Sequence, residues 1–267
     1  MSTPLDEVFR RVRAENRAAL IAYIPAGFPS KVGCTQIIHA LVEAGVDAIE
    51  IGFPYSDPVM DGPTIQAAAE ISLKAGTGAS DVFAALKVAT DAGVAGLIMT
   101  YWNPIERYGI ENFAAAVAAQ GGSGVITPDL PIEEAELWLS STSRNAIHPI
   151  FVVAPSTSDA RLAQVSSKTQ GFVYAASVMG VTGARSDISV DAHELVSRLR
   201  AVTSLPVCVG VGVSTREQAQ SVSAYADGVI VGSAFIKLIL NAHDEASAVT
   251  AVSELAIELA RGVRAGR

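Results

Sequence analysis

The sequence predicts an α/β fold, a single (β/α)8 TIM barrel. Three observations support this prediction. Eight short apolar segments are each followed by a segment with helical character. Most of these short segments are apolar along their whole length, which is typical of strands buried on both faces of a parallel sheet. No dinucleotide-binding fingerprint follows the first strand, so an open doubly wound sheet is the less favoured alternative.

The chain begins with an extra helix and then repeats one unit. Residues 4–14 carry apolar side chains on one helical face, and we expect this helix to plug the lower end of the barrel, where the strands begin. The predicted strands are 19–24, 47–52, 95–100, 124–127, 150–154, 171–175, 206–209 and 227–231. The predicted helices include 64–75, 80–92, 110–120, 132–141, 158–168 and a short one after the eighth strand. Since no linker interrupts this order, residues 1–267 are expected to form one TIM-barrel domain.

Composition excludes several classes of protein. Half of the residues are hydrophobic and 17% are charged, which suffices for a large core, and the net charge of −8 argues against nucleic-acid binding. No apolar run is long enough for a membrane helix, and the N-terminal segment lacks a signal core, so we expect a cytoplasmic protein. Cys34 and Cys208 are predicted to be reduced, buried thiols. The histidines lack ligand spacing, so no metal site is predicted.

Two carboxyl groups follow one another within Asp47–Pro63, which reads DAIEIGFPYSDPVMDGP. Glu50 lies mid-strand among small residues, where burial should raise its pKa. Asp61 follows in the loop after this strand. Two carboxyl groups in different environments can divide the general acid and general base roles. Two structural alternatives stay open: Glu50 can be ion-paired to an arginine across the barrel, and Asp61 can be a turn residue before Gly62.

Glycine clusters follow the seventh and eighth strands. They read VGVGVS at 209–214 and VGSA at 231–234, and the second runs directly into the short apolar helix. In barrels of this kind these two loops and a helix N-terminus often hold phosphate through backbone N–H groups. We therefore predict a phosphate site there, although the same glycines can serve only close packing.

Other features of the sequence limit the kinds of reaction that the site can catalyse. Tyr174 shares the parity of Phe172 and is expected to point into the lumen, either at the site or as a core residue. Residues 176–189 are predicted to form a lid or an ordinary surface loop. All five lysines fall in predicted helices or at their ends, which argues against a Schiff base, and no nucleophile elbow or Walker motif is present. The reaction class that remains is proton transfer on a phosphorylated small molecule.

Three segments resemble the tryptophan synthase alpha subunit family. They are IEIGFPYSDPVMDGPTIQ at 49–66, GVTGA at 180–184 and GVIVGSAFIKLI at 228–239, and the likeness extends over nearly the whole chain. The resemblance implies a lyase of tryptophan biosynthesis. Its reaction is the retro-aldol cleavage of indole-3-glycerol phosphate to indole and glyceraldehyde 3-phosphate, without a cofactor of its own.

The resemblance also implies a role for each site residue. Glu50 would protonate indole C3 and take the proton of the glycerol hydroxyl, while Asp61 would hold the indole N–H. Tyr174 would border the site, and Thr182 would meet Asp61 when the loop closes. The phosphate would be held by Gly183, Gly212, Gly232 and Ser233.

A partner is implied as well. Members of the family pass indole to a pyridoxal-phosphate beta subunit in an α2β2 heterotetramer, and the loop Pro54–Pro58 matches the contact surface. The sequence departs from the family pattern at Phe28, Met60 and Val211. Two alternatives from other classes are a non-catalytic regulatory subunit that binds phosphate ligands and another phosphate-binding barrel enzyme, an isomerase or an aldolase.

Overall fold

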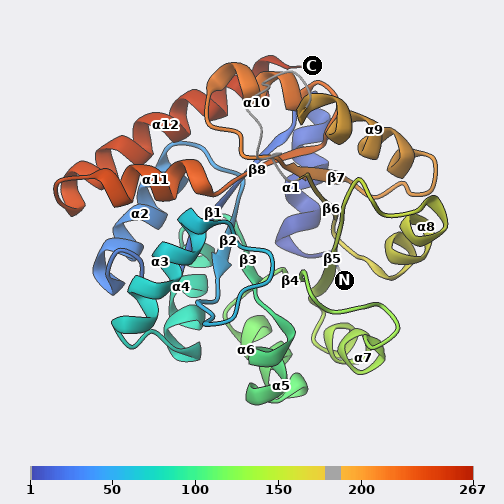
Figure 1. Cartoon of the computed structure of the whole chain (residues 1–267), viewed down its shortest axis with the longest axis horizontal. Helices are drawn as coiled ribbons and strands as arrows, with labels where there is room; N and C mark the ends of the chain where they lie inside the picture. The colour runs from blue at the N-terminus through green and yellow to red at the C-terminus, as the bar shows by residue number, and fades with distance from the viewer. Residues whose placement is uncertain (1, 178–187, 267) are drawn as a thin grey trace.

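The computed structural model of the chain describes residues 2–177 and 188–266. Within these residues eight parallel strands form a closed barrel in which each strand pairs with the next and β8 pairs with β1 (Figure 1). The strands are β1 (Ala19–Pro25), β2 (Ala48–Gly52), β3 (Ala95–Met99), β4 (Gly124–Thr127), β5 (His148–Val153), β6 (Val173–Ala176), β7 (Val207–Gly210) and β8 (Gly228–Val231). The predicted (β/α)8 barrel is confirmed.

Helices surround the strands in Figure 1, except the first helix, which is seen behind the strands. They are α1 (Pro4–Ala14), α2 (Lys31–Glu43), α3 (Pro63–Lys74), α4 (Ala79–Asp91), α5 (Trp102–Tyr108), α6 (Ile110–Ala119), α7 (Glu136–Arg144), α8 (Asp159–Lys168), α9 (Ile188–Arg200), α10 (Arg216–Ser223), α11 (Ser233–Asn241) and α12 (Glu245–Ala265). The extra N-terminal helix and the short helix after the eighth strand lie where the sequence predicts them. In the described part of the chain no helix is both long and apolar enough to cross a membrane.

Most predicted bounds differ from the observed ones by one or two residues, and three differences from the prediction have a physical reason. The helix predicted at 132–141 begins only at Glu136, because the chain after Pro131 first makes tight turns in which Glu134 N–H donates to the Pro131 carbonyl. The sixth strand begins at Val173, since Gly171 has φ of +74° and cannot join an extended strand. The short helix α5 was not predicted, because seven residues carry little periodic signal.

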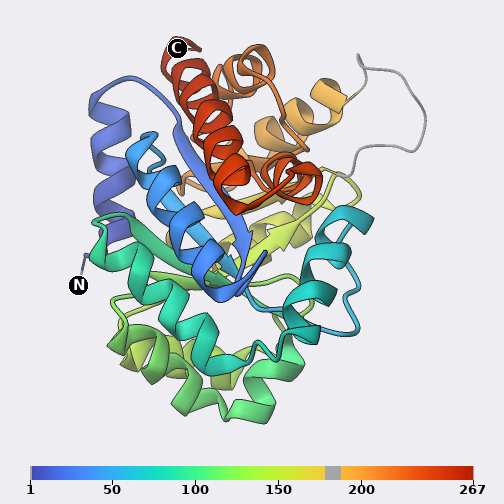
Figure 2. The ribbon, with the colours of Figure 1, turned by 90° about the vertical axis from the view of Figure 1, so that its left-hand side faces the viewer.

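The lower half of the lumen is a packed apolar core. Side chains from the strands and from the inner face of α1 form one cluster, which includes Leu5, Val8, Phe9, Val12, Ile21, Ala48, Leu97, Ile126, Ile150, Phe172, Cys208 and Ile230. The rings of Phe9 and Phe172 meet edge to face with centroids 5.9 Å apart. Figure 2 shows α1 at one end of the barrel and α3 on the opposite side. The helix α1 therefore plugs the lower end, as predicted.

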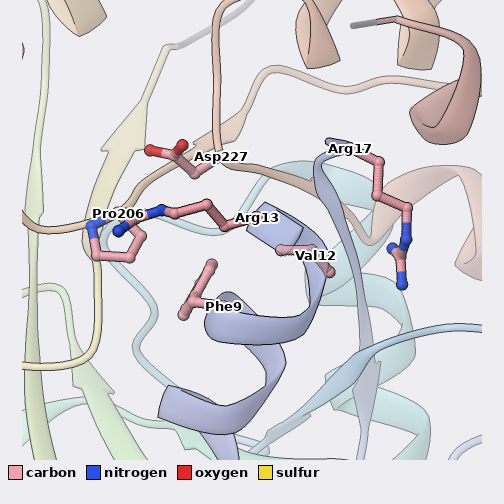
Figure 3. Close-up of a pocket in the computed structure, with 6 residues that line it drawn as sticks. All are labelled: Phe9, Val12, Arg13, Arg17, Pro206 and Asp227. Carbon is pink, nitrogen blue, oxygen red and sulfur yellow. The ribbon is translucent and has the colours of Figure 1, made fainter. Parts of the chain in front are cut away.

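Charged side chains complete this lower end. Asp47 accepts hydrogen bonds from the Arg17 guanidinium at 2.7 and 2.9 Å, from Arg11 at 2.7 Å and from the Leu20 N–H at 2.9 Å. A cavity of about 10 Å³, about the size of one water, lies between Phe9 and Asp227 (Figure 3). Because side chains fill the bottom of the lumen, a substrate has to enter from the upper end, where the strands finish.

Candidate active site

Glu50 lies in the middle of β2 and points into the lumen on the same side as Ala48. It pairs in register with Tyr23 of β1 and Leu97 of β3, and its side chain is fully buried. Neither carboxyl oxygen has a hydrogen-bond partner among the described residues, so the ion-paired alternative finds no partner there. Burial raises the pKa of Glu50 to about 8. Near neutral pH this carboxyl is mostly protonated and can exchange a proton with a bound molecule.

Asp61 lies at the end of the loop between β2 and α3 and is partly exposed. Burial raises the pKa of this carboxyl, and a hydrogen bond with the Tyr101 hydroxyl offsets part of the effect. The same hydroxyl accepts a 3.1 Å hydrogen bond from the Met60 N–H. Tyr101 thus ties the loop that carries Asp61 to the end of β3. Tyr101 was not predicted as a site residue, although its place just after a predicted strand is a signal that could have found it.

Two tyrosines complete the upper lumen. Tyr174 on β6 is partly buried, and its hydroxyl lies 2.7 Å from the point where Gly210 would carry a Cβ. Tyr23 on β1 is also buried, and its hydroxyl lies 2.3 Å from the corresponding point at Gly52. Burial and then nearby carboxylates, among them Glu50, raise the pKa of both phenols. The structure therefore gathers Glu50 and both tyrosines, and Tyr23 is an addition to the residues that sequence reasoning named.

The two glycine clusters have distinct structural features. Gly212 has φ of +71°, which favours glycine, and Gly210 leaves room for the Tyr174 ring. Gly232 is the N-cap of α11 and makes no side-chain capping bond. The first-turn N–H groups of α11, beginning with that of Ser233, consequently have no side-chain cap from Gly232 and no intrahelical acceptor. Such a helix end is suited to bind an anion.

The remaining residues with chemical potential either have a structural role or lie outside the described part of the chain. Thr182 and Gly183, with most of the predicted lid, lie outside the described residues. Asp129 accepts hydrogen bonds from the Trp102 N–H at 2.9 and 3.1 Å, so it fixes the start of α5. Cys34 and Cys208 are buried free thiols, as predicted. All five lysines lie on helices, and no metal-binding cluster of His, Cys, Asp or Glu occurs among residues 2–177 and 188–266.

Comparison with known proteins identifies the family. The family model described as "Tryptophan synthase alpha chain" matches residues 9–264, which is nearly the whole chain. The chain belongs to the tryptophan synthase alpha chain family. The resemblance seen in the sequence motifs is therefore confirmed.

Individual members of the tryptophan synthase alpha chain family match over their full length. The alpha chain of Streptomyces avermitilis is 52% identical, with 98% of this chain and 95% of the relative covered. That of Thermobifida fusca is also 52% identical, with 98% of both chains covered. Among solved structures, a tryptophan synthase chain from Mycobacterium tuberculosis superposes with a TM-score of 0.92 at 48% identity and covers 99% of each chain.

Proposed function

We propose that this chain is the alpha subunit of a tryptophan synthase and that it cleaves indole-3-glycerol phosphate to indole and glyceraldehyde 3-phosphate. Membership of the family makes the chain a carbon–carbon lyase. The observation that best supports the proposed residue roles is the Glu50 carboxyl, buried in the lumen without a hydrogen-bond partner among the described residues. A buried polar group of this kind is costly in the free protein, and a substrate hydroxyl can satisfy it.

The proposed chemistry assigns one task to each carboxyl. Cleavage breaks the bond between indole C3 and the first carbon of the glycerol chain. Glu50 delivers a proton to C3 and takes the proton of the adjacent glycerol hydroxyl, which becomes the aldehyde oxygen. Asp61 accepts a hydrogen bond from the indole N–H and stabilises the positive charge that develops on the ring when C3 is protonated. The different environments of the two carboxyls support this division of roles.

The phosphate of the substrate is assigned to the glycine clusters. Gly212, Gly232 and Ser233 lie after β7 and β8, at the same end of the barrel as Asp61. The uncapped start of α11 supplies N–H groups and the positive end of a helix dipole. Thr182 and Gly183 stay part of the proposal through the family resemblance. Tyr174 borders the ring between Glu50 and Gly210.

The test of this function is a single substitution with two readouts. Glu50→Gln keeps the shape of the side chain but cannot carry a proton, so we expect indole release to fall by about 10²–10⁴-fold. Binding of the substrate, measured by calorimetry, should stay within a few-fold of the natural chain. The control is Glu134→Gln at an exposed position. Near-normal indole release from Glu50→Gln would refute the role assigned to this carboxyl.

We also propose that the upper face of the barrel docks a tryptophan synthase beta subunit in an α2β2 assembly. Around the loop Pro54–Pro58, Asp57 is exposed and Val59 and Met60 present apolar side chains that are 75% and 45% exposed. The reaction above needs no cofactor in this chain, and pyridoxal phosphate is assigned to the partner. Co-elution with a beta subunit in size-exclusion chromatography tests the assembly. A cytoplasmic location remains a prediction.

Family membership does not favour the two alternatives considered from the sequence. A purely regulatory subunit would have no use for a buried glutamate in the lumen that has no hydrogen-bond partner within the described part of the chain. Another barrel isomerase or aldolase would belong to a different family from the one whose model matches residues 9–264.

A further inference from the structure

Tyr23 extends between the two halves of the proposed site. Ala22 pairs in register with Val231, so Tyr23 lies beside Gly232 at the start of α11. A Cβ at Gly232 would lie 3.1–3.2 Å from the Cδ1 and Cβ atoms of Tyr23. The near end of the tyrosine side chain therefore packs directly against the residue proposed to hold phosphate.

The far end of the same side chain reaches β2, the strand that carries Glu50. The Tyr23 hydroxyl lies against Gly52, one lumen position above Glu50 on the same strand. After burial, the charges of Asp61 and then Glu50 raise the pKa of this phenol most, and Glu50 is the register partner of Tyr23 on β2. For Tyr174, the charge of Glu50 raises the pKa most after burial, and that of Asp61 raises it least.

The position of the Tyr23 ring requires glycine at two neighbouring positions. A side chain at Gly52 would collide with the Tyr23 hydroxyl, and a side chain at Gly232 would press on the base of the ring. The ring is thus held along the wall of the lumen from β8 to β2. In the proposed function, the indole lies near Asp61 and the phosphate near Gly232, so the three-carbon chain that joins them has to pass along this wall.

We propose that the Tyr23 hydroxyl hydrogen-bonds to a hydroxyl group of the substrate's glycerol chain, so that Tyr23 selects the hydroxylated chain over a deoxy analogue. This inference rests on the proposed function and adds a binding residue to it. A phenol can both donate and accept a hydrogen bond, which suits a secondary alcohol. A site built to bond a substrate hydroxyl discriminates against an analogue that lacks it, because the polar group of the protein is then left unpaired.

The experiment compares two ligands on Tyr23→Phe. The first is indole-3-glycerol phosphate, followed as kcat/KM for indole release. The second is 3-(indol-3-yl)propyl phosphate, which keeps the ring and the phosphate but lacks both chain hydroxyls, followed as a competitive inhibitor. We expect kcat/KM to fall by about 10-fold, the usual effect of one lost hydrogen bond, while the inhibition constant changes by less than about 2-fold. Tyr225→Phe, the same change between α10 and β8 at the lower end of the barrel, should alter neither value.

Other outcomes overturn the inference. An unchanged kcat/KM in Tyr23→Phe would show that the hydroxyl makes no contact with the substrate. An equal loss of affinity for both ligands would show that only the packing of the ring matters. In both cases the natural chain still releases indole, so the proposed function survives. A natural chain that releases no indole and binds neither ligand would instead overturn the proposed function, and this inference with it.

Discussion

Glu50, the proposed proton carrier, lowers the stability of its own fold. Its carboxyl is buried without a hydrogen-bond partner among the described residues, and its pKa is raised to about 8 from an ordinary value of 4.5. Between these two values the folded chain binds a proton that the unfolded chain has released. The folded state is therefore progressively disfavoured as pH rises through this window, and the loss is complete above about pH 8.

Glu50→Gln should remove this loss of stability at higher pH, since glutamine does not ionise. Between pH 5 and pH 7.5 we expect the free energy of unfolding of the natural chain to fall by about 3 kcal/mol relative to that of the variant. Urea denaturation at both pH values measures the difference. Glu134→Gln, an exposed site, should follow the natural chain. Parallel pH dependence in the natural chain and Glu50→Gln would mean that the carboxyl is solvated or paired.

Among the elements, the loop after β2 depends on the loop after β3. The Tyr101 hydroxyl accepts the Met60 N–H at 3.1 Å and hydrogen-bonds the neighbouring Asp61 carboxyl. Met60 itself is exposed, so no apolar burial of its side chain fixes this part of the loop. One phenol therefore sets the position of the proposed indole-binding carboxyl.

Removing this hydroxyl should lower activity more than stability. For Tyr101→Phe we expect kcat/KM for indole release to fall by about 10- to 100-fold, the range for a lost hydrogen bond to a charged group. The free energy of unfolding should change by only about 1 kcal/mol, since both hydrogen bonds lie at the surface end of the barrel. Steady-state kinetics and urea denaturation give the two values. Tyr108→Phe on the adjacent helix α5 is the matched control, and equal kinetics in both variants would contradict the role of Tyr101.

The same elements show what the sequence can and cannot predict. The barrel was predictable because each strand is short, apolar and followed by a helix. Glu50 was predictable because alternation along β2 places it with Ala48 in the lumen. Tyr101 and Tyr23 were missed because their roles depend on which neighbouring loop or glycine their hydroxyls reach, and no local pattern encodes that. The start of α7 was missed because the turns after Pro131 have no periodic signature.

Across the whole molecule, stability and chemistry occupy opposite ends of the barrel. The lower end holds the plug α1, the buried Arg17–Asp47 ion pair and the apolar core. The upper end holds the carboxyls, the tyrosines and the start of α11. We propose that residues 1–267 unfold as one domain, because β8 closes the barrel onto β1 and α12 packs against both α2 and α10.

Packed aromatic rings connect the lower end of the barrel with the upper end, so the independence of the two ends can be tested. Phe9 of α1 packs on Phe172, whose ring centroid lies 6.3 Å from that of Tyr174. Phe9→Ala removes a buried ring from the plug, so we expect the free energy of unfolding to fall by about 3–4 kcal/mol in a single transition. Leu137→Ala, at an exposed apolar side chain, should change it by less than about 0.5 kcal/mol.

Activity should respond differently from stability in the same variant. At a temperature where Phe9→Ala is fully folded, kcat/KM for indole release should stay within about 2-fold of the natural chain, because Phe172 stays packed in the apolar core of the lumen and still supports Tyr174. A larger loss of activity in the folded variant would show that the plug positions Tyr174 through Phe172. In that case the lower core would belong to the catalytic machinery, and the two ends of the barrel would form one coupled unit.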